Sequence, residues 1–491
     1  MAEDQILARR QKRDALRAAG LNPYPDRWER THSLEEAKPL ADGPDVVSVA
    51  GRVMLLRVIS KKMIFLTLQD RSGRMQISLR LPTLPEAELA LIRDALDLGD
   101  FLGVRGTMWT TRTGEKTLDA TTAVILAKAL RPLPDKWAGV ADTEISYRQR
   151  YLDLLTNDAT RDRFRLRTKF VRSIRNFLDA RGFEEVETPI LCGTASGAMA
   201  KPFFTHHNAL DLDVTLRIAP ETYLKRLVVG GYEKVYEFAR CFRNEGMDPS
   251  HLQDFTMLEY YVAYWNFEDN MRFTQELVQH AVMECSGSLK FTRPGYQGKG
   301  TVDIDLAGEW PRLKIVDLIR EKTGIDVRET RDPAALRDWI RANGHADEDV
   351  NKMAYASLVD HIYKKTVRPG LVQPCFIIGH PIELSPLARR SDADPGITDR
   401  FQLLVNGWEV VNAYSELVDP DDQRGRFEEQ ARAKAAGDEE AMESEEDYLV
   451  CMEHGMPPTS GWGMGIDRLV TLLSGQENLR DAVLFPLMRP E

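Results

Sequence analysis

Residues 240–261 combine side chains that suit phosphate and base chemistry. Within sixteen residues stand, in chain order, Arg240, Arg243, Glu245, His251 and Phe255. An arginine held on a strand presents a planar fork to a phosphate, and a loop histidine and aromatic can cover the rest of a nucleotide. The same residues also suit the salt-bridged edge of a hairpin. This stretch alone leaves both interpretations open.

A second stretch, GWGMGIDRLVTLL at residues 461–473, favours the nucleotide interpretation. Its glycines, Gly461, Gly463 and Gly465, occupy alternate positions of an expected strand, where a ligand or another backbone can come close. The apolar run that follows is expected to form a buried helix. Arg468 then lies at the junction of strand and helix, with its charge free to bind an anion.

These side chains need a rigid support, and the surrounding patterns predict antiparallel strands. Apolar residues alternate in EKVYEFARCF and in DFTMLEYYVAYW, on either side of a polar loop. FQLLVNGWEVVNAYSEL, at residues 401–417, predicts a second strand pair. An amphipathic helix within residues 161–188 is expected to end at Gly182 and to be followed by a strand, FEEVETPIL.

Three segments, RGFEEVETPIL (181–191), FRNE (242–245) and GMGIDR (463–468), resemble the signature motifs of class II aminoacyl-tRNA synthetases. Longer segments are similar to the bacterial lysyl-tRNA synthetases: LRIAPETYLKRLVVGGYEKVYEFARCFRNEG, ALRPLPDK, YRQRYLDL, THHNALDLD and SPLARR. The similarity covers nearly the whole chain from about Val46. It implies an α+β protein with an N-terminal OB-fold β-barrel and a class II catalytic domain, an antiparallel sheet flanked by helices.

The resemblance also implies lysine--tRNA ligase activity. ATP would activate lysine to lysyl-adenylate, and the lysyl group would pass to the 3′ end of tRNA(Lys). Such chemistry depends on positioning and on cations placed where charge develops. At the matching positions, Arg243 is expected to hold the α-phosphate and the lysine carboxylate. His251 and Arg468 would hold the outer phosphates, while Glu245 and Phe255 would contact the adenine.

Lysine carries two ammonium groups, so a selective pocket needs at least two anionic anchors. The resemblance assigns Glu221 and the backbone of Gly197 to the α-ammonium, and Glu416 and Tyr261, supported by Glu259, to the ε-ammonium. Asn412 would orient the carboxylate, and Tyr414 replaces a common phenylalanine of the pocket. An aspartate- or asparagine-specific relative would need a cation at the pocket floor, and AYSEL and EYY have no arginine nearby.

The family binds Mg²⁺, the expected cofactor, through two glutamates seven positions apart. Here Glu409 matches the second glutamate, and Gln402 stands in place of the first. An amide oxygen can still coordinate magnesium, but the site loses one charge, and ligand charge tunes the affinity for hard cations.

Residues 46–130 show five short strand patterns and one helical interlude, LPEAELALIRDAL, which predict an OB-type barrel. The sheet face of such a barrel often binds single-stranded nucleic acid. The resemblance assigns anticodon contacts to Phe65, a stacking aromatic, and to Gln76, a base-edge hydrogen bonder. Thr122 stands where the family usually has a glutamate that contacts the anticodon.

Three regions are expected along the chain. Residues 1–135 would contain an N-terminal helix and the OB-fold anticodon-binding domain, and residues 136–160 an interdomain linker. Residues 161–491 would form the class II catalytic domain, with an insertion at about 265–385. The resemblance implies a homodimer, with its interface formed by the helix and strand that precede Pro189.

Composition is consistent with a protein of two or more globular domains, since 29% of the 491 residues are charged and 43% are hydrophobic. The net charge of −11 argues against a protein that coats nucleic acid but allows local basic patches. Five scattered cysteines without CxxC spacing indicate neither zinc nor disulfides. No apolar stretch approaches a membrane span, so a cytoplasmic location is expected.

Two other functions remain open at this point. A paralogue that forms lysyl-adenylate but uses a non-tRNA acceptor would fit the changes at Thr122 and Gln402. A non-catalytic tRNA-binding regulator would fit the fold, although the presence of Arg243, Glu245 and Arg468 argues against it.

Overall fold

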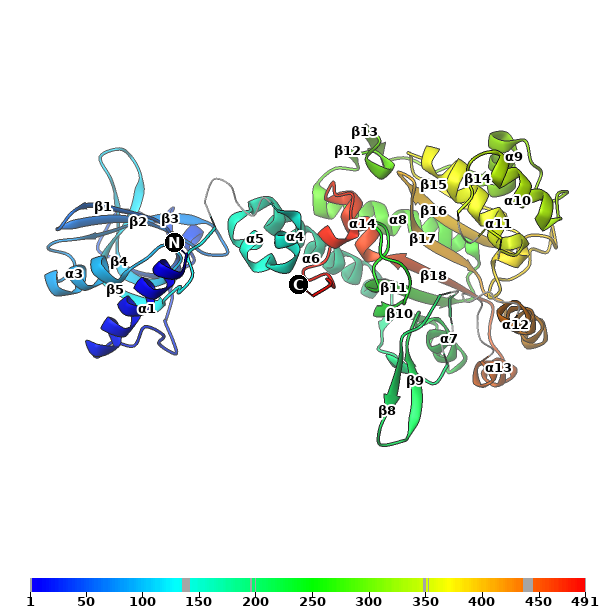
Figure 1. Ribbon diagram of the computed structural model, residues 1–491, viewed down its shortest axis with the longest axis horizontal. Helices are drawn as coiled ribbons and strands as arrows, with labels where there is room; N and C mark the ends of the chain where they lie inside the picture. Colours follow the sequence, from blue (N-terminus) through cyan, green and yellow to red (C-terminus); the bar gives the residue numbers. More distant parts are fainter. Residues whose placement is uncertain are drawn as a thin grey trace. The chain divides into compact units, whose positions relative to one another are not determined.

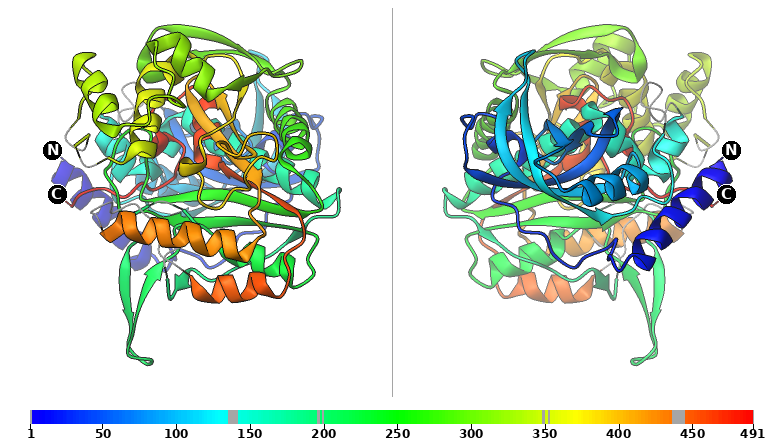
Figure 2. Two further views of the ribbon diagram at one scale, coloured as in Figure 1. Left: turned by 90° about the vertical axis from the view of Figure 1, so that its right-hand side faces the viewer. Right: turned by 90° about the vertical axis from the view of Figure 1, so that its left-hand side faces the viewer.

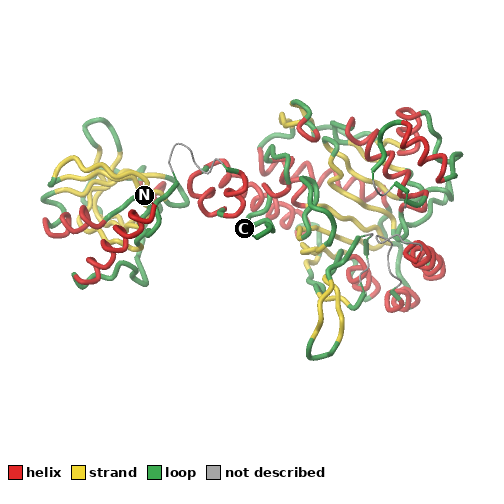
Figure 3. Tube along the Cα trace, viewed as in Figure 1, coloured by secondary structure: helices red, strands yellow, loops and turns green. Residues whose placement is uncertain are grey.

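Two units make up the computed structural model, which describes residues 2–134, 142–194, 197–198, 200–347, 350–351, 353–435 and 445–490. The first unit contains Met1–Asp142 and Tyr151–Thr156, and the second contains Thr143–Arg150 and Asn157–Glu491. Both units combine helices and strands (Figure 3), so the chain is α+β, as the sequence predicts.

The strands of the first unit close into a barrel in the order β1-β2-β3-β5-β4. Its elements are α1 (Ala2–Ala18), α2 (Leu34–Ala37), β1 (Val46–Ser60), β2 (Met63–Gln69), β3 (Arg74–Arg80), α3 (Glu86–Ala95), β4 (Phe101–Thr110) and β5 (Lys116–Ala127). Every second residue of β2 is buried inside the barrel, because successive side chains of a strand point to opposite faces. Five strands and one helical interlude confirm the expected OB fold.

An eight-stranded sheet forms the centre of the second unit (Figure 1). Its strands, in spatial order, are β14 (Arg312–Lys314), β15 (Cys375–Ile378), β16 (Arg400–Val405), β17 (Trp408–Ser415), β18 (Thr459–Gly465), β11 (Asp254–Ala263), β10 (Lys234–Phe242) and β6 (Glu184–Glu185). Only the two edge pairs, β14–β15 and β10–β6, are parallel. The expected strand pairs β10–β11 and β16–β17 are present.

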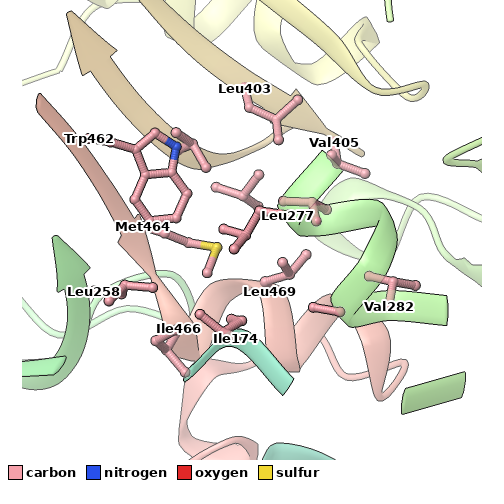
Figure 4. Packing of buried hydrophobic residues seen from close by; sticks show 14 of the residues in the cluster. Ile174, Leu258, Leu277, Val282, Leu403, Val405, Trp462, Met464, Ile466 and Leu469 are labelled. Atoms are coloured by element: carbon pink, nitrogen blue, oxygen red, sulfur yellow. The ribbon is translucent and has the colours of Figure 1, made fainter. Parts of the chain in front are cut away.

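One face of this sheet carries the core of the unit. Alternate residues of the central strands, such as Leu258 and Trp462, pack there against Leu277 and Leu469 of the covering helices (Figure 4). These helices are α6 (Asp158–Asp179), α8 (Phe267–Ser286) and α14 (Ile466–Leu473). The residues between the core positions point to the opposite face of the sheet.

Helices also lie on that opposite face. There α7 (Glu221–Val229) packs on β10 and β11, and α13 (Glu446–Glu453) packs between α7 and α12 (Pro420–Ala435). A separate cluster covers β15 and β16 with the helices α9 (Ile315–Thr323), α10 (Pro333–Ala342) and α11 (Tyr355–Ile362). The orange α12 and the orange-red α13 run next to each other in Figure 2.

The remaining elements lie outside the barrel and the main sheet. They are α4 (Thr143–Arg148), α5 (Arg150–Thr156), β7 (Leu191–Cys192), β8 (Phe204–His207), β9 (Leu212–Leu216), β12 (Lys290–Pro294) and β13 (Thr301–Asp305). The hairpin of β8 and β9 projects away from the sheet in Figures 1 and 2.

One expected strand is shorter than predicted. Within FEEVETPIL only Glu184–Glu185 pairs with the main sheet, and the chain has left it before Pro189. The apolar residues of this segment favour a longer strand, but proline has no N–H to donate to a neighbouring strand. The stretch 265–385 supplies α8 to the core and β14 and β15 to the sheet, in addition to the cluster around α9–α11.

Candidate active site

The alternate glycines of β18 open a trough on the face opposite the core. A Cβ atom at Gly461 would overlap the Glu416 carboxylate and the Tyr261 ring, and one at Gly463 would lie 3.6 Å from Cγ of Glu259. Side chains of the neighbouring strands therefore use the space above β18 that glycine leaves free. The close approach at Gly461 is made by side chains, whereas the glycine pattern predicts a ligand or another backbone.

Strand register brings residues of distant segments together across this trough. One row of paired positions consists of Glu259, Gly463, Asn412 and Gln402. The next row consists of Tyr261, Gly461, Tyr414 and Arg400. Because paired residues of neighbouring strands point to the same face, β11, β16 and β17 contribute to a single site.

Three buried carboxylates lie at one end of this site. Glu221, Glu259 and Glu416 have exposed fractions of only 6%, 4% and 1%. Lys225, one helical turn after Glu221, forms an ion pair with Glu221 at 2.5 Å and another with Glu416. A pocket with three acids and one base is suited to bind a further cation.

Tyrosine hydroxyls orient two of these acids. The hydroxyl of Tyr414 donates to Oε1 of Glu221 at 2.6 Å, and that of Tyr261 donates to Oε2 of Glu259 at 3.0 Å. Glu416 is different, because no hydroxyl or amide among the described residues donates to it, and Lys225 is its ion-pair partner. A buried carboxylate in this state favours a ligand that brings N–H donors.

The protonation of the acids follows from their burial. Burial raises the pKa of Glu259 to about 8, and the charge of Glu221 adds to this. Burial also raises the pKa of Glu416, against the opposing effect of Lys225. An arriving ammonium group would favour the ionised forms of both acids.

Gly197 lies directly against Glu221. Its φ of +87° is one that favours glycine, and a Cβ there would lie 3.1 Å from Cβ of Glu221. Gly197 and Glu221, which the family resemblance assigns to the α-ammonium group of lysine, are therefore neighbours.

The guanidinium of Arg243 lies beside an aromatic ring. Arg243 directly follows β10, its guanidinium carbon lies 5.1 Å from the centroid of the Phe255 ring, and its backbone N–H donates to Gln253 at 2.9 Å. Its buried Nε has no hydrogen-bond partner among the described residues. The arrangement is suited to bind an anion beside an aromatic ring.

Arg240 behaves differently from Arg243. It forms an ion pair with Asp254 and donates to Thr256 at 3.0 Å, across the hairpin of β10 and β11. The interpretation as a salt-bridged hairpin edge is therefore right for Arg240, and the anion-binding interpretation fits Arg243.

The loop between β10 and β11 carries Glu245 and His251. Nδ1 of His251 lies 2.8 Å from Asp248 and 3.1 Å from Ser250, and the ring is exposed. Glu245 is half-buried. Gln253 holds this loop by donating to the carbonyl of Gly246 at 3.2 Å.

Arg468 and Glu409 meet at the start of α14. Nη1 of Arg468 donates to the backbone carbonyl of Glu409 at 2.9 Å. The preceding Asp467 accepts from Arg167 of α6 at 2.5 Å and from the backbone N–H of Thr256 at 2.9 Å. These bonds fix the junction of β18 and α14, so the Arg468 side chain projects from a rigid base.

The donor groups at Glu409 and Gln402 suit a divalent cation. Oε1 of Gln402 is buried without a hydrogen-bond partner among the described residues. Burial alone would raise the pKa of Glu409, but nearby cations hold it below its ordinary value: Arg368, Arg468, Arg400 and Lys364. Where residues are described, no three His, Cys, Asp or Glu side chains converge as a metal site. One carboxylate and one free amide oxygen fit a cation that also takes ligands from phosphates and water.

The sequence analysis missed two cationic residues of the site, Lys225 and Arg400. Nε of Arg400 donates to Oδ1 of Asn412 at 2.8 Å, which leaves the amide N–H groups of Asn412 for an anion. The only sequence signal for Lys225 is its helical spacing from Glu221 in APETYLKR. Arg400 gives no comparable signal, because its partner is on another strand.

Phe65 and Gln76 both lie on the outer face of the barrel. Phe65 of β2 is half-buried and lies between core positions of that strand. Gln76 of β3 pairs with Thr67 of β2. The amide nitrogen of Gln76 donates to Thr117 at 2.9 Å. These two positions are diagonal neighbours that a single-stranded ligand would reach together.

No helix in the described residues is long and apolar enough to cross a membrane.

Family models match both units. Residues 142–489 match the family described as tRNA synthetases class II (D, K and N), and residues 47–126 match the OB-fold nucleic acid binding domain.

Curated relatives match along the full chain. The lysine--tRNA ligase of Pelotomaculum thermopropionicum is 45% identical over 489 residues, which cover 99% of this chain and 95% of the relative. That of Enterococcus faecalis is 44% identical over 495 residues, covering 99% and 97%. That of Thermosynechococcus vestitus is 44% identical over 492 residues, covering 98% and 96%.

Proposed function

The chain belongs to the lysine--tRNA ligases within the class II tRNA synthetases, and we propose on this basis how its own residues carry the reaction. The enzyme uses ATP to join lysine to tRNA. The observation that carries the residue assignments is that the charge of Arg243 acts on Glu259, one of the three buried acids, while its Nε has no hydrogen-bond partner among the described residues. A substrate that is cationic at one end and reactive at its carboxylate fits this arrangement.

The first step would be attack of the lysine carboxylate on the α-phosphate of ATP, with pyrophosphate as the leaving group. Arg243 would hold both reacting groups, since among the described residues its Nε has no hydrogen-bond partner that competes for it. Phe255 would stack on the adenine, and Glu245 would accept from its amino group. His251 and Arg468 would hold the outer phosphates. Charge that develops on the phosphate is stabilised by these fixed cations.

A divalent cation, proposed to be Mg²⁺, would be held by Glu409 and Gln402. When bound it would neutralise phosphate charge. The unpartnered amide oxygen of Gln402 supports this assignment. Arg468 would hold the phosphates from the neighbouring position, where its side chain is fixed at the carbonyl of Glu409.

The acidic pocket would select lysine. Glu221, beside Gly197, would accept from the α-ammonium group, and Glu416 with Tyr261 and Glu259 would accept from the ε-ammonium group. The free amide N–H groups of Asn412 would orient the carboxylate, and Tyr414 would hold Glu221 by its hydroxyl. The burial of Glu416, with Lys225 as its ion-pair partner among the described residues, supports a further cationic ligand there.

The barrel, within residues 1–135, would bind the anticodon of tRNA(Lys) through Phe65 and Gln76. Residues 136–160 would link it to a catalytic domain at residues 161–491 with an insertion at about 265–385. The five free cysteines fit the reducing cytoplasm as its compartment.

A homodimer is also proposed. The segment around Pro189 carries the exposed apolar residues Ile190 and Leu191, and the nearby hairpin adds Phe204 and Leu212. Exposed apolar side chains of this kind favour a partner surface. Light scattering would give the mass in solution.

Full-length similarity to curated lysine--tRNA ligases gives no support to a non-tRNA acceptor or to a non-catalytic regulator. The retained Arg243 and Arg468 agree with an active enzyme.

Lysine-dependent exchange of pyrophosphate into ATP tests the proposal, followed by charging of unfractionated tRNA. Lysine should support exchange and charging, while aspartate and asparagine should support neither. Exchange with aspartate, or none with lysine, would contradict the pocket assignment.

A further inference from the structure

The ammonium group of Lys225 is a buried cation that the proposed mechanism does not use. Its side chain has an exposed fraction of 0%, and it pairs with Glu221 at 2.5 Å and with Glu416. These are the two carboxylates assigned to the α-ammonium and ε-ammonium groups of lysine. Lys225 therefore lies between the acids at the two ends of the substrate.

The groups around Lys225 come from several elements: Glu221 of α7, Tyr261 of β11, Tyr414 and Glu416 at the end of β17, and Tyr448 of α13. Glu259 acts on Glu416 in turn. The centroids of the three tyrosine rings lie between 5.6 and 5.9 Å from Nζ. This distance allows cation–π attraction. With aromatic walls and little water, one charge strongly changes the protonation of its neighbours.

The charges of the pocket balance only when Lys225 is counted. Glu221, Glu259 and Glu416 provide three carboxylates in the same buried space. Bound lysine would bring two ammonium groups, since its own carboxylate is assigned to Arg243, and Lys225 supplies the third. Without Lys225, one acid would have to keep a proton, because an unpaired buried carboxylate is costly.

We propose that Lys225 is a positioning residue for lysine recognition, which holds the carboxylates of Glu221 and Glu416 in place in the empty pocket and favours their ionised forms. The substrate then meets two carboxylates that are already oriented by one cation. The inference rests on the proposed lysine pocket and deepens it, because Lys225 acts through the two acids rather than on the substrate. Glu416 supports it most directly, since among the described residues only Lys225 forms an ion pair with its carboxylate.

Equilibrium binding of L-lysine, measured by calorimetry from about pH 6 to about pH 9, tests this role. Lys225→Met removes the charge, Lys225→Gln removes the charge but keeps N–H donors, and Lys225→Arg keeps the charge. Lys128→Met is the matched control. Lys128 is equally buried and pairs with Asp97 at 2.7 Å and with Asp100 at 2.6 Å, but it belongs to the barrel.

Loss of the cation should raise the pKa of the pocket acids, so protons should compete with lysine over a wider range. In both neutral variants, lysine affinity at pH 7 should fall at least about tenfold. The pH above which affinity stops rising should move up by at least about one unit. Lys225→Arg and Lys128→Met should keep the wild-type profile. Titration of lysine itself is common to all the proteins and cancels in the comparison.

Infrared spectra of the ligand-free proteins provide a second measurement that needs no binding. Both neutral variants should show a stronger band from protonated carboxyl groups near neutral pH than the wild type.

Several outcomes would overturn the proposal. An unchanged affinity, a loss of equal size at every pH, or no gain in the protonated carboxyl band would each do so. If both neutral variants unfold while Lys128→Met stays folded, Lys225 is needed for folding and the proposal fails. Failure of the wild-type protein to bind lysine is a distinct result, which would refute the proposed pocket itself.

Discussion

Arg240 and Arg243 lie three positions apart in the chain, yet only Arg240 has an acidic partner within the hairpin. Their residue type is the same, and local sequence therefore leaves their roles undecided. The difference arises because Asp254 lies opposite Phe242, whose side chain points to the same face as that of Arg240, and its carboxylate pairs with Arg240. This contrast provides a matched pair of variants.

Arg243→Ala should lower the rate of lysine-dependent pyrophosphate exchange by about 100- to 1000-fold, because a fixed cation is lost where phosphate charge develops. Arg240→Ala should leave the rate within about threefold, since an exposed ion pair contributes little. Initial exchange rates at saturating ATP and lysine check both. Equal losses in the two variants would refute the role of Arg243.

Glu259 should make lysine binding pH-dependent. Burial raises the pKa of Glu259 to about 8, so its carboxyl carries a proton in the empty pocket at neutral pH. A bound ammonium favours the ionised form, so protons compete with lysine below about pH 8, and affinity should rise with pH by up to about tenfold per unit until that value. Glu259→Gln should show weaker binding with a flatter profile. Calorimetry in matched buffers measures this, and an unchanged slope would contradict the assignment.

The separate acids of the site follow from the family resemblance, but their connection does not. Glu221 and Glu416 are far apart in the chain. Lys225 can pair with Glu416 only because α7 packs on the sheet. Sequence reasoning reaches the helical neighbour of a residue, because spacing fixes it. It cannot reach the partner that tertiary packing supplies.

At the scale of elements, β18 shows which structural features a sequence pattern alone can predict. Its alternating glycines predict a close approach to the strand, and the apolar run after them predicts a buried helix; side chains do come close at Gly461, and α14 is present. The strand predicted at FEEVETPIL is mostly absent. Its apolar residues favour a strand, whereas Pro189 does not. The glycines are informative because only a missing side chain allows such close approach.

Gly461→Ala should destabilise the protein by about 1–3 kcal/mol, since the new methyl group would overlap Glu416 and Tyr261. Gly463→Ala is the control within the same strand, because its Cβ would meet Glu259 at an ordinary contact distance of 3.6 Å. Its change in unfolding free energy should stay below about 0.5 kcal/mol. Denaturant unfolding of both variants measures these changes. A loss of stability in Gly461→Ala as small as that in Gly463→Ala would show that the chain is not closely packed at Gly461.

Gln402 makes the β16–β17 pair a test of cation binding. Gln402→Glu should increase the affinity for Mg²⁺ in the presence of ATP, because a second carboxylate favours a hard cation. Without the cation the same variant should be less stable than the wild type, since the new carboxylate would be buried at a position with a 6% exposed fraction. Calorimetric Mg²⁺ titration and thermal unfolding check these effects. Coincident titration curves would show that Gln402 does not face the cation.

At the scale of the whole molecule, the division of labour between the two units is itself testable. Phe65→Ala should reduce kcat/KM for tRNA charging by about 5- to 150-fold, as expected for one lost base stack of about 1–3 kcal/mol. Pyrophosphate exchange should stay unchanged, because it needs no tRNA. Phe101→Ala, which removes another partly exposed barrel aromatic on β4, should leave both rates unchanged. A loss of exchange in Phe65→Ala would contradict separate roles for the units.

The two-faced sheet also determines where the chain can change length during evolution. In β11, Leu258 and Tyr260 face the core while Glu259 and Tyr261 face the site. Inserting or deleting one residue would exchange these faces, placing a carboxylate in the core and removing it from the pocket. Length variation among descendants of this gene should therefore be confined to connections outside the sheet, such as the tip of the projecting β8–β9 hairpin. Point substitutions, in contrast, can alter either face without disturbing the other.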